Sequence, residues 1–358
     1  MLEHIKIECV RNLVSAELGL AEGATILFGA NGSGKTSLLE AIHLLGVGRS
    51  FRTHQSKPVI QHDAELCRVV GRVRNRGRTF TMGIEKHRSG EVKARVAGEA
   101  VPSLSELAQQ LPLVVLDTAG LGLVTGPPEG RRRLLDGTLF HVEQGFLPLW
   151  RRYAQAVRQR NSGLRRGIMS SDAAWREELA VTGEQLTAAR VAVADRYAEL
   201  LSKLAQALSP DIAEVQLVFR PGWDRRETLR NTLEKIAQSD AAQGFTQVGP
   251  HRADIRLMVG GMPAGEVLSR GQMKLLLVAL KLAQGQMIEE SGPMGPLYLV
   301  DDLPAELDQA HCASVCAQLG TARQVVLTAV DRRSLEAAWP DGDLKMFHVE
   351  QGGLSLAA

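Results

Sequence analysis

A glycine-rich segment close to the start of the chain constrains its fold more than any other feature. The segment spans residues 29–36 and fits the pattern Gly-x-x-x-x-Gly-Lys-[Ser/Thr] of a phosphate-binding loop. An apolar run at 24–28 precedes it and predicts a buried strand, and residues 37–45 follow with the apolar spacing of a helix. Because a chance glycine-rich loop has no reason to lie between such a strand and such a helix, we interpret the segment as a P-loop.

The chemistry of a P-loop accounts for the residue types in this segment. Glycines let the backbone turn tightly, so that successive N–H groups point at one chain of phosphates. The start of the following helix adds partial positive charge. Lys35 is expected to reach the β- and γ-phosphates of a nucleotide, and Thr36 is expected to hold Mg²⁺. The nucleotide-binding residues predicted from the motif are Gly29, Ala30, Asn31, Gly32, Ser33, Gly34, Lys35 and Thr36.

The overall composition limits the class of protein. A length of 358 residues permits one large domain or two of ordinary size, and the formal net charge of +2 neither demands nor excludes nucleic acid. The four cysteines include no Cys-x-x-Cys pair, which disfavours a zinc site and favours reduced thiols. Because the sequence shows no signal-peptide core and no apolar run of ~18 residues, we expect a cytoplasmic protein with no membrane partner.

The regions flanking the P-loop unit predict mainly strands. Alternating apolar and polar residues indicate strands at 4–10 and 13–20 and an antiparallel meander between 66 and 101. The meander is rich in basic residues, for which two interpretations remain open: a solvated strand face, or a surface that contacts phosphates. These residues are Arg68, Arg72, Arg74, Arg76, Arg78, Lys86, Arg88, Lys93 and Arg95. Further elements are predicted as strands at 111–116, 215–219, 255–259, 297–300 and 324–328 and as helices at 104–110, 226–238 and 275–288.

The composition changes after residue 128 and stays helical and arginine-rich to about residue 242. Three- and four-residue apolar spacing predicts a helix over 147–164, with an apolar face formed by Leu147, Trp150, Ala154, Val157 and Leu164. Arg151, Arg158 and Arg165 recur every seven residues on a different stripe of this helix.

A second long helix is predicted to return along the first. It begins at Asp172, a plausible N-cap, and ends just before Pro210, which makes it ~50 Å long. We therefore predict two domains: an ATPase-like α/β domain of residues 1–127 plus 245–358, and an inserted helical arm of residues 128–244.

Two acids at the end of a predicted strand complement the P-loop. Asp301 and Asp302 directly follow the apolar residues 297–300. A strand-end acid of this kind holds Mg²⁺ through water in P-loop enzymes, so we assign Asp301 that role together with Thr36. Asp302 is expected to orient or deprotonate the attacking water. We predict Lys35, Asp301 and Asp302 as catalytic residues, against the alternative that the two acids are only a turn signal.

A short motif before an apolar helix narrows the class further. Leu268-Ser269-Arg270-Gly271-Gln272 resembles the Leu-Ser-Gly-Gly-Gln signature of ABC-type ATPases, and Glu306-Leu307-Asp308 resembles their D-loop. In that class, the signature contacts the γ-phosphate of ATP held by another subunit. The resemblance therefore implies ATP and Mg²⁺ as cofactors, an ATP-dependent head-to-tail homodimer, and nucleotide contacts from Ser269, Arg270, Gly271 and Gln272.

Further motifs along nearly the whole chain resemble the RecF family, on the RecF and SMC branch of these ATPases. They are Arg11-Asn12, residues 29–40, residues 46–52, Gly126-Pro127-Pro128, residues 131–136, Arg158-Gln159-Arg160-Asn161, Gly249-Pro250-His251-Arg252, residues 268–274, Asp301-Asp302 and residues 306–308. The resemblance adds Arg11, Asn12 and Ser37 to the expected ATP-binding residues. The expected fold class is α/β: a P-loop ABC-type ATPase head with an antiparallel β subdomain and an inserted helical arm lobe.

The same resemblance implies an activity and partners. It implies weak, DNA-stimulated ATP hydrolysis and ATP-driven clamping of duplex DNA near single-strand gaps and single-strand/double-strand junctions. It also implies work with RecR and RecO to load RecA, in the cytoplasm at the nucleoid. Arg151, Arg158 and Arg165, and the meander, are the candidate DNA contacts.

Some features depart from the pattern or leave alternatives open. Thr118-Ala119 stands where the family usually has Pro-Glu, so no role is carried to that loop. Residues 328–330 lack the switch histidine of transporter ATPases, which suggests slow turnover. His251 is interpreted as a structural turn residue, with phosphate or DNA contact as the alternative. The competing functions are a transporter ATPase subunit, disfavoured by the long insertion, and an ATP-gated protein scaffold.

Overall fold

The computed structural model describes residues 1–53, 55, 57–292, 295–321, 324–336, 338–339 and 343–357, without the side chains of Thr118, Ala119 and Glu306. Its internal contacts divide the chain into two compact units. The head unit comprises Met1–Gly120, Ala207–Ser209 and Lys274–Ala358, and the arm unit comprises Leu121–Gln206 and Pro210–Met273. The arm unit thus extends past the predicted boundary at residue 244, because the strand at 254–259 pairs with a strand of the arm and not with a sheet of the head.

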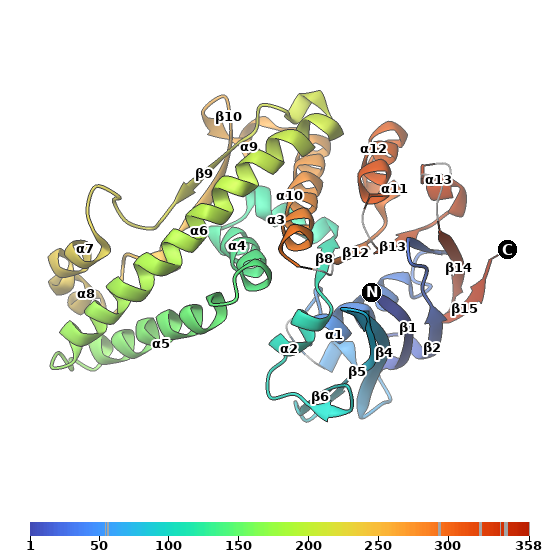
Figure 1. Ribbon diagram of the computed structural model, residues 1–358, viewed down its shortest axis with the longest axis horizontal. Helices are drawn as coiled ribbons and strands as arrows, with labels where there is room; N and C mark the ends of the chain where they lie inside the picture. The colour runs from blue at the N-terminus through green and yellow to red at the C-terminus, as the bar shows by residue number, and fades with distance from the viewer. Residues whose placement is uncertain are drawn as a thin grey trace. The chain divides into compact units, whose positions relative to one another are not determined.

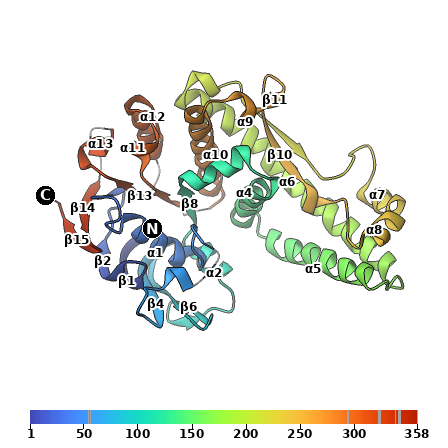
Figure 2. The same ribbon diagram turned by 180° about the vertical axis from the view of Figure 1, so that it is seen from behind.

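The head unit contains a mostly parallel sheet that carries the P-loop. Its order is β15-β14-β3-β13-β12-β8. The strands are β3 (Ala24–Phe28), β8 (Leu113–Leu116), β12 (Leu297–Val300), β13 (Gln324–Ala329), β14 (Leu344–Glu350) and β15 (Gly353–Leu356). Every residue of β12 and β13 is buried, as continuous apolar runs in a parallel sheet require. β15 pairs antiparallel with β14 at the edge of this sheet (Figure 2).

A second, antiparallel sheet of the head has the order β2-β1-β4-β5-β6-β7. Its strands are β1 (Leu2–Val10), β2 (Leu13–Gly19), β4 (Leu66–Asn75), β5 (Arg78–His87), β6 (Val92–Val96) and β7 (Glu99–Ala100). Alternate residues of β4 are buried, since successive side chains of a strand point to opposite faces. The predicted meander is therefore confirmed.

Helix α1 (Lys35–Val47) contacts strands of both head sheets. It is buried on nearly all sides, including Leu38, Leu39 and Ile42, and its side chains join one core with those of the two sheets. The helix that follows the P-loop is thereby fixed in place. The other head helices are α2 (Ser105–Gln110), α11 (Leu303–Glu306), α12 (Gln309–Leu319), α13 (Arg332–Glu336) and most of α10 (Arg270–Ser291). The four cysteines are free thiols.

The arm unit is built on two long helices, α5 (Phe146–Arg165) and α6 (Asp172–Leu208), which confirms the predicted pair. They leave a common turn and diverge along their length (Figures 1 and 2). The arm also holds α3 (Gly122–Thr125), α4 (Pro128–Val142), α7 (Leu229–Lys235), α8 (Ala237–Gln243) and α9 (Ala264–Val267). Its sheet has the order β11-β10-β9, formed by β9 (Gln216–Arg220), β10 (Asp254–Val259) and β11 (Met262–Pro263).

Two predictions about the arm were wrong in detail. The buried face of α5 comprises Phe146, Tyr153, Ala156, Arg160 and Leu164, whereas the predicted face member Trp150 is 38% exposed. The predicted face is displaced because the buried stripe of this helix includes Arg160, which a search for apolar spacing passes over. The predicted single helix at 226–238 is two helices, α7 and α8, which meet at Ile236.

Within the residues that the structure describes, no helix is both long enough and apolar enough to cross a membrane.

Candidate nucleotide site

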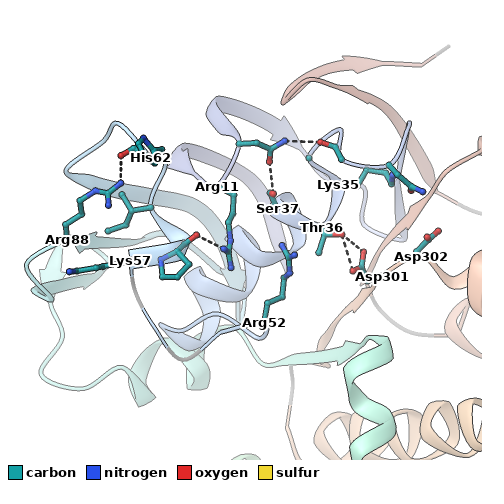
Figure 3. A pocket seen from close by; sticks show the side chains of 16 residues that line it. Arg11, Lys35, Thr36, Ser37, Arg52, Lys57, His62, Arg88, Asp301 and Asp302 are labelled. Carbon is teal, nitrogen blue, oxygen red and sulfur yellow. Dashed lines mark hydrogen bonds between the residues drawn. The ribbon is translucent and has the colours of Figure 1, made fainter.

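A pocket of about 970 Å³ opens beside the P-loop in the head unit (Figure 3). It brings together most of the residues that the sequence predicted for nucleotide and metal binding. Those lining it are Arg11, Asn12, Asn31, Gly32, Gly34, Lys35, Thr36, Ser37, Asp301 and Asp302. The remaining P-loop residues Gly29, Ala30 and Ser33 belong to the loop itself, between β3 and α1.

The P-loop backbone requires glycine at several positions. Gly29, Gly32 and Gly34 have φ values of 153°, 80° and 120°, a region that side chains disfavour. At Gly29 a Cβ atom would also lie 2.2 Å from the carbonyl oxygen of Val349. Among the described residues no side chain caps the N-terminus of α1, so its first N–H groups remain available to an anion. The buried Ser33 hydroxyl has no hydrogen-bond partner among the described residues, which fits a loop shaped for phosphates.

Lys35 is held against the loop that precedes it. Its Nζ donates to the carbonyl oxygens of Gly29, at 2.7 Å, and Ala30, at 3.0 Å. Burial lowers the pKa of Lys35, while the negative charges of Asp302 and Asp301 act in the opposite direction. These contacts keep the ammonium at the side of the pocket where the motif places the phosphates.

Thr36 and Asp301 meet directly although they are far apart in the sequence. The Thr36 hydroxyl lies 2.9 Å from Oδ1 and 3.1 Å from Oδ2 of Asp301 (Figure 3). A hydroxyl and a carboxylate in contact are hard oxygen donors of the kind that Mg²⁺ prefers. The described residues contain no cluster of three or more His, Cys, Asp or Glu side chains suited to a metal. Thr36 and Asp301 therefore fit a Mg²⁺ ion, which these two residues would hold, Asp301 through water.

The three residues added by the family resemblance also line the pocket: Arg11, Asn12 and Ser37. Asn12 connects to the loop twice: its Nδ2 donates to the Gly32 carbonyl at 3.3 Å, and its Oδ1 accepts from the Ser37 hydroxyl at 2.7 Å. Arg11 donates two 2.8 Å bonds to the carboxylate of Glu40, which is 0% exposed. Burial alone would raise the pKa of Glu40, but hydrogen bonds from Arg11 and Ser50 outweigh it and the pKa is lowered.

Sequence reasoning missed one end of the pocket. Arg52, Lys57, Pro58, Ile60, His62 and Arg88 also line it. Arg88 holds this end in shape, because its guanidinium donates to the carbonyls of Gln61, His62 and Ala64. Arg52 could have been found, since it closes the family motif at residues 46–52. The others carry no local signal. Backbone contacts of residues 59–61 with residues 9–11 hold this segment beside Arg11, and Arg88 is bonded to the same segment.

The signature residues belong to the arm unit and start α10. Ser269 and Gln272 form a capping box: the Gln272 side chain accepts from the Ser269 N–H at 2.8 Å, and the Ser269 hydroxyl accepts from the Gln272 N–H at 3.3 Å. Ser269, Arg270 and Gly271 are exposed to solvent. Asp308 of the D-loop motif caps α12 by accepting from the His311 N–H at 2.9 Å, and the Glu306 side chain lies outside the described residues.

The two sets of candidate DNA contacts differ in their environment. On α5, Arg151, Arg158 and Arg165 are all exposed. On the meander, several basic residues pair with acids: Arg68 pairs with Glu85 at 2.6 Å, and Arg72 pairs with Glu3 at 3.2 Å. This pairing favours the interpretation of the meander as a solvated strand face.

His251 and Arg160 both have structural partners in the arm unit. His251 Nδ1 lies 2.7 Å from the Tyr153 hydroxyl, and its Nε2 lies 3.0 Å from the Thr246 carbonyl. Burial lowers the pKa of His251 to about 4, so the ring is neutral and the structural interpretation is supported. Arg160 is 1% exposed and binds Asp172 at 2.9 Å and Asp240 at 2.6 Å.

Comparison with protein families and relatives agrees with this geometry. A family model for the RecF/RecN/SMC N-terminal domain matches residues 1–355. A "DNA replication and repair protein RecF" of Azotobacter vinelandii is 41% identical, over 99% of this chain and 98% of the relative. A protein of the same description from Stutzerimonas stutzeri is 42% identical, over 99% of this chain and 97% of the relative.

Solved structures of the same kind resemble the chain over its full length. A structure described as the recombination mediator protein RecF-ATP in the RecFOR pathway superposes with a TM-score of 0.87 at 25% identity, over 100% of this chain and 97% of that one. An SMC head bound to the C-terminal winged-helix domain of ScpA superposes at 0.59 with 16% identity, over 99% of this chain and 97% of that one. The second likeness concerns the fold alone.

Proposed function

The chain belongs to the RecF family, and from this premise we propose that it is an ATP-dependent DNA-binding protein of recombinational repair. The observation that carries the proposal is the hydrogen bond between Thr36 and Asp301, beside a loop whose backbone has the glycine conformations of a P-loop. Relatives described as DNA replication and repair proteins, and a solved relative described with ATP, support it. The family assignment also removes the transporter subunit from the competing functions.

In this proposal the head unit binds ATP and hydrolyses it. Lys35 contacts the β- and γ-phosphates, and the N–H groups of residues 29–36 surround them. Thr36 and Asp301 hold Mg²⁺, which neutralises charge on the phosphates when bound. Asp302 orients the attacking water and accepts its proton. Asp302 adjoins Asp301 and lines the same pocket as Lys35, which is the placement that this role needs.

The proposed active form is a head-to-tail homodimer closed by ATP. The exposed start of α10, with Ser269, Arg270 and Gly271, contacts the γ-phosphate bound by the partner subunit's P-loop. The N–H groups of Arg270 and Gly271, which the Ser269–Gln272 capping box does not use, and the helix dipole favour an anion at this start. Hydrolysis removes the γ-phosphate and with it this contact, so the dimer opens.

The closed dimer binds duplex DNA, with the arginine stripe of α5 as the proposed contact surface. Arg151, Arg158 and Arg165 are exposed at seven-residue spacing, and an α-helix brings such residues to one side at intervals of ~10 Å. Contacts of this kind are made to phosphates and carry little sequence preference. We further propose that single-strand/double-strand junctions are preferred, and that RecR, with RecO, acts with this protein in loading RecA in the cytoplasm.

Sedimentation with defined nucleotides and DNA tests the proposal. The chain is run alone, with ADP and with ATP, each in the presence of a fully paired duplex or a gapped duplex of equal length. We expect a monomer without ATP, a dimer with ATP, and co-sedimentation of the dimer with DNA, stronger for the gapped duplex. Equal DNA binding under all three nucleotide conditions would exclude an ATP-driven clamp.

A further inference from the structure

Thr328 lies in the middle of the parallel sheet of the head, in the strand between β3 and β12. It lies near the end of β13, which is hydrogen-bonded to the P-loop strand β3 on one side and to β12, the strand before Asp301, on the other. Its side chain is 0% exposed. A buried hydroxyl needs hydrogen-bond partners, and the identity of those partners defines what Thr328 does.

Both partners belong to the pair of acids beside the P-loop. The Thr328 hydroxyl donates to Oδ1 of Asp301 at 2.8 Å. The same oxygen accepts the backbone N–H of Asp302, also at 2.8 Å. Since the hydroxyl has one proton and it is given to Asp301, the Asp302 contact uses a lone pair of the oxygen. One atom therefore fixes the carboxylate of one acid and the backbone of the next.

The contact to Asp302 stabilises an unusual backbone conformation. Asp302 has φ 49° and ψ 47°, the left-handed region that residues other than glycine seldom adopt. This turn, directly after β12, is what places the Asp302 side chain at the wall of the pocket. Holding the N–H of Asp302 therefore also sets where its carboxylate lies.

The Asp301 carboxylate also contacts Thr36, which shares the oxygen Oδ1 with Thr328. Thr36 approaches Oδ1 at 2.9 Å and Oδ2 at 3.1 Å, from the P-loop side. The carboxylate of Asp301 thus accepts hydrogen bonds from a hydroxyl of helix α1 and from a hydroxyl of β13. Second contacts of this kind orient metal-ligating carboxylates.

We propose that Thr328 is a positioning residue for ATP hydrolysis: it orients Asp301 toward Mg²⁺ and fixes Asp302 at the attacking water. The proposal rests on the ATPase function proposed above and assigns a role to β13, the strand between the two that carry the known motifs. Thr328 is 0% exposed and does not belong to the residues that line the pocket, so it acts only through the two acids.

Substitutions at Thr328 separate this role from simple packing. Thr328→Val keeps the shape of the side chain and removes both hydrogen bonds, Thr328→Ser keeps the hydroxyl, and Thr328→Cys keeps a weak donor and acceptor. Thr25→Val is the matched control, because Thr25 is also 0% exposed, lies in the neighbouring strand β3, and accepts a 3.0 Å bond from the Ala21 N–H.

Two measurements are made on each full-length variant: steady-state ATP hydrolysis, and equilibrium binding of a fluorescent ATP analogue with Mg²⁺ or with excess EDTA. For Thr328→Val we expect kcat to fall about 10–100-fold, the usual effect of losing an outer contact of a metal ligand, with KM for ATP within about threefold. The gain in nucleotide affinity from Mg²⁺ should also shrink, while affinity in EDTA stays unchanged. Thr328→Ser should restore both quantities, and Thr25→Val should alter neither.

The outcomes separate this inference from the proposed function. If the unaltered chain neither binds nor hydrolyses ATP, the proposed function is wrong and the inference falls with it. If it does both, but Thr328→Val keeps its kcat and its Mg²⁺ gain, only the role of Thr328 is wrong. The role would also be wrong if Thr328→Ser lost as much kcat and Mg²⁺ gain as Thr328→Val. If Thr328→Val does not fold, the other two variants test the role. Thr328→Ser should then hydrolyse ATP faster than Thr328→Cys, and equal rates for the two would contradict the role.

Discussion

Lys35 is held in place before any nucleotide arrives, since two carbonyls of its own loop accept its ammonium protons. Its position is thus set by the loop, and the size of the cation matters as well as its charge. An ammonium fits between these carbonyls and the phosphates, whereas a planar guanidinium is larger and directs its donors differently.

We expect Lys35→Arg to bind ATP with modest loss and to lower kcat by about 100-fold or more, because the charge is retained and its placement is not. Measuring nucleotide binding and hydrolysis on one preparation would show whether hydrolysis falls far more than binding. The same variant tests the remaining scaffold function: full repair of damaged DNA in cells carrying Lys35→Arg would mean that hydrolysis is not needed.

A second prediction at this scale concerns pH. Burial lowers the pKa of His251 to about 4, whereas the unfolded value is 6.5. Between these values the unfolded chain binds a proton that the folded chain does not, so the free energy of unfolding decreases as the pH falls. Loss of solvent also lowers the pKa values of His43 and His141 to about 4.

Thermal unfolding from pH 7 to pH 4.5 should therefore show a falling Tm. His251→Gln keeps a donor and an acceptor for Thr246 and Tyr153 and removes one titrating ring, so its Tm should fall less steeply over this window. Parallel slopes for the two proteins would contradict the assignment of a neutral, buried His251.

The residues around the phosphates could be predicted from the sequence because their chemistry is encoded by local spacing. The P-loop and the strand-end acids needed only a strand, a turn and a helix in order. His62 and Arg88 could not be placed at the pocket, and the contacts of Thr328 with the two acids could not be predicted, because all of them depend on pairing between distant segments. Such pairing has no periodic signal in one sequence.

At the scale of single elements, helix α5 combines two kinds of arginine. Arg160 faces inward and joins α5 to α6 and α8 through Asp172 and Asp240. A buried charge that loses its partner is costly, so Asp240→Ala should lower the free energy of unfolding by about 3–5 kcal/mol. Urea unfolding, monitored by circular dichroism, would measure this loss. A decrease in the free energy of unfolding below about 1 kcal/mol would mean that water replaces the Asp240 carboxylate.

The outward arginines should behave differently. Arg158→Ala with Arg165→Ala should leave stability nearly unchanged and weaken DNA binding, with a shallower dependence of log K on log salt by about 2, one for each lost phosphate contact. Arg230→Ala is the control, because Arg230 is an exposed arginine of the same unit whose charge is already paired with Glu177. Equal salt slopes for all three proteins would place the DNA elsewhere.

The elements of the arm show where periodicity succeeds and where it fails. The length of α6 was predictable because its apolar residues repeat regularly from 179 to 208. The face of α5 was not, since Arg160 interrupts the pattern and only tertiary partners reveal that it is buried. β14 and β15 were not predicted, because a strand pair of mixed polarity at a sheet edge carries a weak signal.

At the scale of the whole molecule, the two halves of the proposed ATP site lie in different compact units, with the P-loop in the head and the signature in the arm. If two copies complete each other's sites, variants defective in different halves should rescue one another. Ser269→Arg blocks the signature, and Asp302→Asn removes the water-activating carboxylate while keeping ATP bound.

Each of these variants alone should be inactive, and a mixture with Ser269→Arg in excess should hydrolyse ATP. The mixed dimer retains one site with an intact P-loop, intact acids and an intact signature. Hydrolysis measured across a titration of one variant into the other checks this. A mixture no more active than the sum of its components would argue against a shared site.

The inward arginine of α5 affects how genetic data on this protein should be understood. Arg158, Arg160 and Arg165 stand on one helix, and a screen for substitutions that abolish repair would place Arg160 first, since its loss disturbs the packing of the arm. If the variants were ranked by phenotype alone, the mapped DNA surface would move by about 140–160° around the helix, onto its buried side. A map drawn from loss of repair therefore needs the folded fraction of every variant measured beside it.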